Sequence, residues 1–302
     1  MASVLEQVLI LFVFALAGFV LSKAKLVDGN QVGVLSKLEF YIFLPCVTFQ
    51  TFAQRFTVAY LQEKYSLVLI SIGILLALEL FARLIAPRLS RDSYQRLVYR
   101  YSIMIPNYGF FGYALMQALF GADGLMDMMM FTLPMNVYVT TVGYMMLTNQ
   151  PGKLSAKKLL TPSIITMLLG CIVGITGFAL PNVIDQIVEK SAACMAPISM
   201  LLAGMVIAQY DLKALVTNKQ AYLICALRLL IIPALIFAVL KLTGLEIAML
   251  TAIITYCAPC GLNPIVYGKL AGQDCRSAAS LTLISTVLAL VTIPLCVHFF
   301  IG

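Results

Sequence analysis

Two short segments of this chain combine proline, glycine and asparagine within long apolar stretches. Residues 105–112 read IPNYGFFG and residues 257–264 read CAPCGLNP. Proline removes a backbone donor and glycine lowers the cost of unusual dihedral angles, so both segments should release backbone amides and carbonyls from helical hydrogen bonds. Inside a membrane such groups are tolerated only where they face protein, water, an ion or a substrate. The two segments therefore predict a binding site.

The predicted substrate-binding residues come from both segments: Pro106, Asn107, Tyr108, Gly109, Pro259, Cys260, Gly261, Asn263 and Pro264. A half-helix would begin at each break, and its N-terminus carries roughly half a positive elementary charge, which favours an anionic group. The amides of Asn107 and Asn263 both donate and accept hydrogen bonds, so they would position a carboxylate or an ion. A single proline would be read as a packed structural kink, whereas a matched pair of breaks favours a site.

Composition places these segments in a membrane. Of the 302 residues 62% are hydrophobic and only 11% are charged, which is too little polar surface to cover a soluble globule. A bilayer-spanning helix needs on the order of 20 apolar residues. We therefore predict an all-α membrane protein of ten transmembrane helices, the fourth and ninth of which are the broken ones. The ten runs lie at 4–22, 35–54, 65–86, 97–120, 127–147, 162–180, 192–209, 220–240, 246–268 and 278–300.

Landmark residues recur at a nearly constant spacing and predict an internal repeat. Pro45 and Pro197 are 152 residues apart, Pro106 and Pro259 are 153 apart, and the pairs Gly121–Gly272 and Asp123–Asp274 are each 151 apart. Residues 1–150 would form a first five-helix repeat and residues 160–302 a second one. Because five spans is an odd number, the second repeat would be inverted relative to the first, as in many secondary transporters. Pro45 and Pro197 are candidate gating residues or plain kinks.

The basic residues predict how the chain is oriented. Fifteen lysines and arginines fall on one side of the ten predicted spans and four on the other. Cytoplasmic loops carry the excess of positive charge, so both termini should lie outside the cell (inner) membrane. The net charge of +7 is thereby explained by topology and by contact with anionic membrane lipid, and no nucleic-acid partner is implied.

Two charged residues lie within predicted spans. Glu79 is eight residues before Pro87 in the third span, and Arg228 is nine residues after Lys219 in the eighth. Both would lie about 12–14 Å along the helix from the cytoplasmic end. Charges at this depth are costly and indicate a function, here a Glu79–Arg228 coupling pair. The alternative, which the sequence weighs equally, is that Glu79 pairs with Arg83 one turn away and Arg228 extends to the lipid headgroups.

Other motifs do not support enzyme chemistry. Cys257 and Cys260 have redox-like spacing, but they fall within a predicted membrane break, and the remaining cysteines are scattered. His298 is the single histidine and lies near the end of the last span, so no His-rich metal site is expected. The chain has no Gly-rich phosphate loop followed by lysine and serine or threonine. We expect no catalytic residues, no cofactor and no metal.

The chain resembles the auxin efflux carrier family of membrane transporters, related in fold to bile-acid/sodium symporters. The resemblance covers essentially the whole chain and rests on residues 44–49 (LPCVTF), on Pro106, Asn107 and Gly112, on residues 259–267 (PCGLNPIVY), and on Ala289, Leu290 and Pro294. Ala114 replaces a proline of the plant carriers, and their long cytoplasmic loop is absent, which indicates a compact prokaryotic-type member. The resemblance implies that helices 4 and 9 cross at their breaks, that helices 1, 2, 6 and 7 form a scaffold, and that helices 3–5 and 8–10 form a moving transport bundle.

These patterns together predict a secondary transporter. Its substrate would be a small organic anion, such as a dicarboxylate or an aromatic carboxylate like an auxin, moved by an elevator-like or rocking motion. A channel-like uncoupled facilitator and a transport-dead membrane sensor are the alternatives. Glu79 would permit coupling to H⁺, and the asparagines with the freed carbonyls would permit Na⁺. Relatives associate through their scaffold helices, and Gly204 would allow close helix packing there, so a homodimer is expected.

Overall fold

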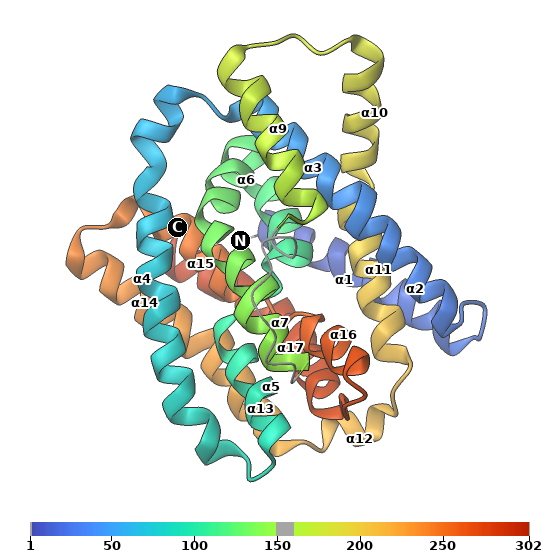
Figure 1. Cartoon of the computed structure of the whole chain (residues 1–302). Coiled ribbons are helices and arrows are strands. Elements are labelled where there is room, and N and C mark those ends of the chain that lie inside the picture. Colours follow the sequence, from blue (N-terminus) through green and yellow to red (C-terminus); the bar gives the residue numbers. More distant parts are fainter. Residues whose placement is uncertain (1, 149–159, 302) are drawn as a thin grey trace.

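The computed structural model describes residues 2–148 and 160–301, and apart from one isolated β-bridge their regular structure is helical (Figure 1). Residues 149–159, which include the segment between the two predicted repeats, lie outside the described residues. The helices are α1 Ala2–Lys23, α2 Gly29–Leu38, α3 Leu44–Arg55, α4 Val58–Leu89, α5 Ser93–Met104, α6 Tyr113–Tyr138, α7 Tyr144–Thr148, α9 Pro162–Thr176, α10 Asn182–Ala193, α11 Met195–Ala208, α12 Leu212–Val216, α13 Lys219–Ala226, α14 Ile232–Thr243, α15 Met249–Cys257, α16 Asn263–Leu270 and α17 Arg276–Phe300.

Within residues 2–148 and 160–301, six apolar helices are long enough to cross a membrane. They are Val4–Lys23, Gln31–Arg55, Val58–Leu89, Asn182–Ala208, Lys219–Thr243 and Arg276–Phe300. The prediction of an all-helical multi-pass membrane protein is thereby confirmed. The other four predicted spans fall on shorter or interrupted helices, namely α5 with the start of α6, the rest of α6 with α7, α9, and α15 with α16. The count of ten spans stays a prediction.

Several spans contain a π-helical turn, and two of these turns are explained by a nearby proline. Proline lacks the amide hydrogen and its ring clashes with the carbonyl four residues earlier, and one extra residue in the turn relieves that clash. Pro45 follows the π-helix η1, Glu39–Phe43, and Pro233 follows the π-helix η4, Leu227–Ile231. The two remaining π-helices are η2, Tyr108–Gly112, and η3, Val139–Gly143, and a 3₁₀ turn, η5, covers Glu246–Ala248.

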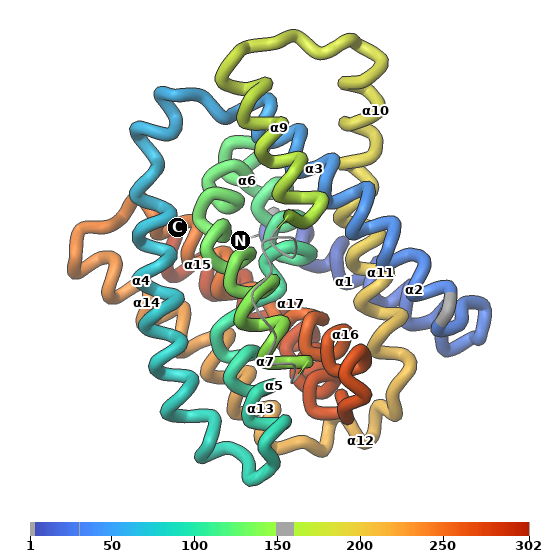
Figure 2. Tube along the Cα trace, in the orientation of Figure 1, coloured from blue at the N-terminus to red at the C-terminus, as the bar shows by residue number. Residues whose placement is uncertain are grey.

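Two helix pairs approach so closely that glycine is required between them. A Cβ atom on Gly204 of α11 would lie 1.8 Å from the Ala15 carbonyl oxygen of α1, and one on Gly18 of α1 would lie 2.0 Å from the Leu201 carbonyl oxygen. In the other pair, a Cβ on Gly170 of α9 would lie 2.8 Å from the Phe49 carbonyl oxygen of α3. The trace in Figure 2 shows α9 lying along α3. Backbone-to-backbone contact of this kind is typical of membrane helices.

Gly204 therefore does not support a dimer in the way that the sequence suggested. Its surface is buried against α1 of the same chain, because Ala15 and Phe19 occupy the space beside it. A second copy of the protein could not use this glycine without displacing α1. The homodimer itself stays a prediction.

Glycines with positive φ angles end the interrupted helices. Gly121 has φ 67° and divides α6 into two helices, and Gly272 has φ 66° and lies between α16 and α17. Only glycine adopts this left-handed region without steric cost. Gly121 therefore ends the half-helix that follows the first break, and Gly272 follows α16, the half-helix after the second break.

Candidate functional site

The two predicted breaks lie against each other. Helix α5 ends at Met104, and the chain is non-helical until η2 begins at Tyr108; α15 ends at Cys257, and α16 begins at Asn263. The backbone amide of Asn107 donates a hydrogen bond of 2.8 Å to the Pro259 carbonyl, and Pro106 and Cys260 form an isolated antiparallel bridge. Two backbones that lack helical partners thus satisfy part of each other's hydrogen bonding.

Hydroxyl groups of α17 complete the bonding of the second break. The Cys260 amide donates to Ser285 Oγ at 2.9 Å, and Thr282 Oγ1 donates to the Gly261 carbonyl at 3.2 Å. Neither residue is among the predicted site residues. Their positions, four and seven residues into an apolar stretch of a neighbouring span, resemble those of ordinary back-bonding hydroxyls, so composition alone could not identify them.

The two site asparagines have different surroundings. Asn263 donates from Nδ2 to the Tyr101 hydroxyl at 2.8 Å, so part of its hydrogen-bonding capacity is already used. Asn107 is buried, with 7% of its surface exposed, and its side chain makes no hydrogen bond to any described residue. Tyr108 donates to Asn136 Oδ1 at 2.8 Å. Asn107 therefore presents, at the contact between the breaks, a side-chain amide that bonds to no described residue.

Both half-helices begin at this contact, and there is space beside it. The helical turn that starts at Tyr108 has first-turn amides without intrahelical acceptors. In the first turn of α16 Pro264 has no amide hydrogen, and the Ile265 amide already donates to the Leu262 carbonyl at 2.9 Å. A Cβ on Gly109 would meet no atom within 4 Å, whereas one on Gly261 would contact the Asn107 backbone at 3.7 Å. The arrangement combines positive helix ends with an open position at Gly109.

The structure does not bring Glu79 and Arg228 together. Glu79 accepts from Arg83 Nε at 2.6 Å and forms an ion pair with Arg100, and the Tyr138 hydroxyl donates to Glu79 at 3.2 Å. The local alternative, Glu79 with Arg83, is the arrangement observed, and Arg100 extends it. Sequence reasoning missed Arg100 because it lies 21 residues from Glu79 on the next helix. A coupling role for Glu79 stays a prediction.

Arg228 adopts neither of its predicted arrangements. Its side chain does not extend to a headgroup region, because the residue is completely buried within the helix bundle. Its guanidinium carbon lies 5.4 Å from the centre of the Tyr256 ring. Among the described residues, none accepts a hydrogen bond from Nε, Nη1 or Nη2 of Arg228.

The predicted gating prolines lie beside a buried carboxyl group that the sequence analysis overlooked. Pro45 is buried in the first turn of α3, and Pro197 is the third residue of α11. Glu39, six residues before Pro45, is 1% exposed and accepts a hydrogen bond from Ser199, two residues after Pro197. The other oxygen of Glu39, Oε2, has no partner within the described part of the chain.

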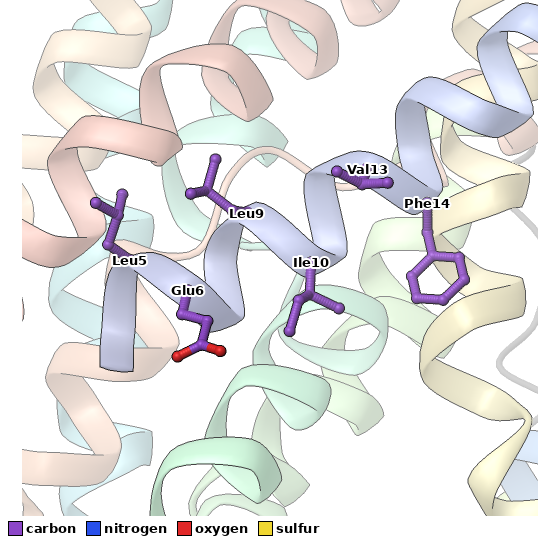
Figure 3. Close-up of a pocket in the computed structure, with 6 residues that line it drawn as sticks. All are labelled: Leu5, Glu6, Leu9, Ile10, Val13 and Phe14. Carbon is purple, nitrogen blue, oxygen red and sulfur yellow. The ribbon is translucent and has the colours of Figure 1, made fainter. Parts of the chain in front are cut away.

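Two surface hollows are lined by other parts of the molecule. Figure 3 shows the first, of about 530 Å³, along α1, where Glu6 lies among apolar side chains. Its lining residues are Leu5, Glu6, Leu9, Ile10, Val13 and Phe14. The second, of about 320 Å³, is formed by the end of α3 with α9 and α10. Neither hollow is lined by a residue of the two breaks.

No metal-binding cluster is found in the ranges 2–148 and 160–301, where no group of three or more His, Cys, Asp or Glu residues is placed to hold an ion. All eight cysteines are free thiols in the structure. Cys257 and Cys260 are both buried, and they are not joined to each other.

An all-helical multi-pass membrane protein with two interrupted helices in contact is the class that these observations define. A family model described as membrane transport protein matches residues 3–297, so the chain belongs to the membrane transport protein family, and its resemblance to auxin efflux carriers is confirmed. A protein of Methanothermobacter thermautotrophicus named an uncharacterized transporter is 24% identical over 299 residues, and the alignment covers 96% of each chain. The chain is accordingly a membrane transporter by family.

Proposed function

We propose that this protein is a secondary transporter that carries a small organic anion through a site at the contact of its two broken helices. The observation that supports this most directly is the hydrogen bond from the Asn107 amide to the Pro259 carbonyl, which brings both breaks to one place. Two half-helix N-termini would then lie close to one place, and positive helix ends favour a carboxylate. The side chain of Asn107, which makes no helix-capping bond and no hydrogen bond to a described residue, would supply a ligand, and the open position at Gly109 would give room for the anion.

Backbone geometry supports the proposal of two inverted five-helix repeats. Gly18 contacts Leu201, and Gly170 contacts Phe49. Gly170 is 152 residues after Gly18, and Leu201 is 152 residues after Phe49, so the repeat relates one contact to the other. The left-handed residues follow the same spacing: Lys25, with φ 60°, and Gly177, with φ 65°, are 152 residues apart. An offset of 152 also relates Asn107 to Pro259, so the contact between the breaks would lie near the pseudo-twofold axis. These matches concern conformation and contact, and they are independent of the identities that suggested the repeat.

The packing also supports a division into a scaffold and a moving bundle. The glycine contacts join α1 to α11 and α3 to α9, which are the first, second, sixth and seventh of the proposed spans. The helices of the proposed bundle instead meet the breaks through polar groups. We propose an elevator-like motion of the bundle past the scaffold, in an inner membrane with both termini outside, and coupling to H⁺ or Na⁺.

The proposal predicts that carboxylates bind at the breaks. Purified full-length protein would be titrated with succinate and with indole-3-acetate, with and without sodium and at two pH values, and its thermal unfolding recorded. A ligand that binds only the folded state raises its stability. We expect Asn107→Ala to weaken carboxylate binding by about 10-fold to 100-fold, because a buried polar contact to a charged group contributes about 1.5–3 kcal/mol.

Gly109→Ala is the matched steric test. The added methyl group meets no protein atom, so stability should be unchanged, while a ligand that occupies this space would be hindered. Gly73→Ala, on α4 and equally free of contacts, is the control. Unaltered affinity in both Asn107→Ala and Gly109→Ala would remove the breaks from the binding site.

A further inference from the structure

Arg228 is a fully buried cation that finds no hydrogen-bond acceptor in the described part of the chain. It is the second residue of the π-helical turn η4, whose extra residue relieves the steric clash of the Pro233 ring. All three of its guanidinium nitrogens are buried and unpartnered among the described residues. Its contact with the aromatic face of Tyr256 contributes on the order of 0.5–2 kcal/mol. Removing a charge from water costs several kcal/mol, so this contact does not compensate for the burial of Arg228.

The helices around Arg228 offer no carboxylate. η4 packs mainly against α13, α14, α15 and α17, and none of these four helices contains aspartate or glutamate. Their other titratable or charged groups are Lys219, Tyr222, Cys225, Lys241, Tyr256, Cys257, Arg276, Cys296 and His298. Arginine does not lose its proton in proteins. Cys260, in the adjacent helix break, also lies within electrostatic reach of Arg228. The counter-charge must therefore be a thiolate or phenolate of these residues, or an anion that comes from outside the chain.

Arg228 shares its neighbours with the second helix break. Tyr256, over which its guanidinium lies, is two residues before the break begins at Ala258. The Cys225 thiol on α13 contacts the Leu281 carbonyl at 3.8 Å, and Ser285, one turn further along α17, binds the Cys260 amide. The unpartnered cation and the broken backbone are thus supported by the same face of α17. The Tyr256 hydroxyl is itself buried without a partner among the described residues.

We propose that the guanidinium of Arg228 is the counter-charge for the carboxylate of the transported anion. This inference rests on the proposed function. In the conformation described here Arg228 is enclosed, and it becomes compensated when a carboxylate enters beside the break. Arginine suits this role because its planar fork matches a carboxylate with two hydrogen bonds. It follows that the substrate carries at least one carboxylate and that its neutral amide is a poor ligand.

The binding test compares each carboxylate with its neutral amide. Full-length protein in one detergent would be titrated calorimetrically with succinate and succinamide, and with indole-3-acetate and indole-3-acetamide. We expect the wild-type protein to prefer the carboxylates and Arg228→Met to lose about 10-fold to 100-fold in carboxylate affinity while its amide affinity is unchanged. Arg228→Lys, which keeps the charge and loses the fork, should be intermediate. Arg88→Gln, on the exposed surface of α4, is the control and should behave as the wild type.

Stability of the ligand-free protein distinguishes this role from an internal ion pair. If Arg228 has no partner, Arg228→Met removes an uncompensated charge, and the midpoint of thermal unfolding should stay the same or rise. If Arg228 pairs with a buried thiolate, the same change should lower the midpoint or prevent folding, and either result would overturn the proposal. An equal preference for carboxylate in Arg228→Met and wild type would also overturn it.

Failure of the proposed function gives a different result. If no carboxylate binds the wild-type protein, the proposed anion transport and the proposed role of Arg228 are both rejected. If carboxylates bind and Asn107→Ala weakens them, the site at the breaks stands, and only an unchanged carboxylate preference in Arg228→Met rejects Arg228.

Discussion

Two kinds of helix contact hold this molecule together. Where α1 meets α11 and α3 meets α9, glycine lets one backbone press on another, and a carbonyl oxygen occupies the place of a missing Cβ. Where the two broken helices meet, the contact consists of one backbone hydrogen bond with serine, threonine and tyrosine hydroxyls around it. The first contact is specific in shape and leaves no room for change. The second uses groups that can exchange partners.

The difference indicates which parts can move. A close-packed interface has few alternative arrangements, because any shift forces atoms to overlap. Polar groups at a helix break can instead be satisfied by protein, by water or by a ligand. We therefore expect the glycine contacts to persist through transport and the contacts at the breaks to change.

The largest expected effect is at the glycine contact. Gly204→Ala places a methyl group 1.8 Å from the Ala15 carbonyl oxygen, and α1 must move away from α11 to accept it. We expect a loss of about 3 kcal/mol, at the upper end of the cost of overpacking. Thermal unfolding of purified protein measures it. Gly73→Ala, in a helix position without contacts, should be neutral or slightly stabilising. Equal stability of the two variants would show that α1 and α11 are not in close contact.

A smaller loss is expected when the ion cluster beside the breaks is removed. Glu79 accepts from Arg83, Arg100 and Tyr138, and its side chain is 13% exposed. Glu79→Gln leaves two cations without a counter-charge and should cost roughly 2 kcal/mol. Arg100→Gln should reproduce most of that loss, because the Arg100 side chain is 18% exposed, whereas Arg83→Gln, 60% exposed, should cost little. A larger loss in Arg83→Gln than in Arg100→Gln would mean that the surface pair dominates.

The sequence could predict the breaks but not what surrounds them. Proline, glycine and asparagine change the backbone conformation locally, so the composition of residues 105–112 and 257–264 is enough to predict a non-helical backbone there. The partners of Glu79 depend on how α4 and α5 face each other, and the sequence contains no periodic pattern that fixes the rotation of a helix that is apolar on all sides. For the same reason the sequence could not predict the neighbours of Arg228, and the expected contact with Glu79 is not formed.

Glu39 shows the same limit more sharply. Glu39 is the fifth residue of the predicted span 35–54, near one end of an apolar run, where a carboxylate usually reaches water. The structure instead buries it against Ser199 of α11, and the π-helical turn before Pro45 carries it there. The turn adds one residue to the helix and rotates everything before it, so counting residues at 3.6 per turn places Glu39 on the wrong face.

The smallest effect is expected for the same substitution at this second carboxyl group. Glu39→Gln keeps an acceptor for the Ser199 hydroxyl and removes no ion pair, because no described residue pairs with Glu39 as a cation. We expect a change in stability below about 1 kcal/mol, well under that of Glu79→Gln. Ser199→Ala is the matched control and should cost more than Glu39→Gln, since it leaves the Glu39 carboxyl group buried without its donor. A loss in Glu39→Gln as large as that in Glu79→Gln would place a bound cation at Glu39, and the close-packed side of the molecule would then also hold a ligand.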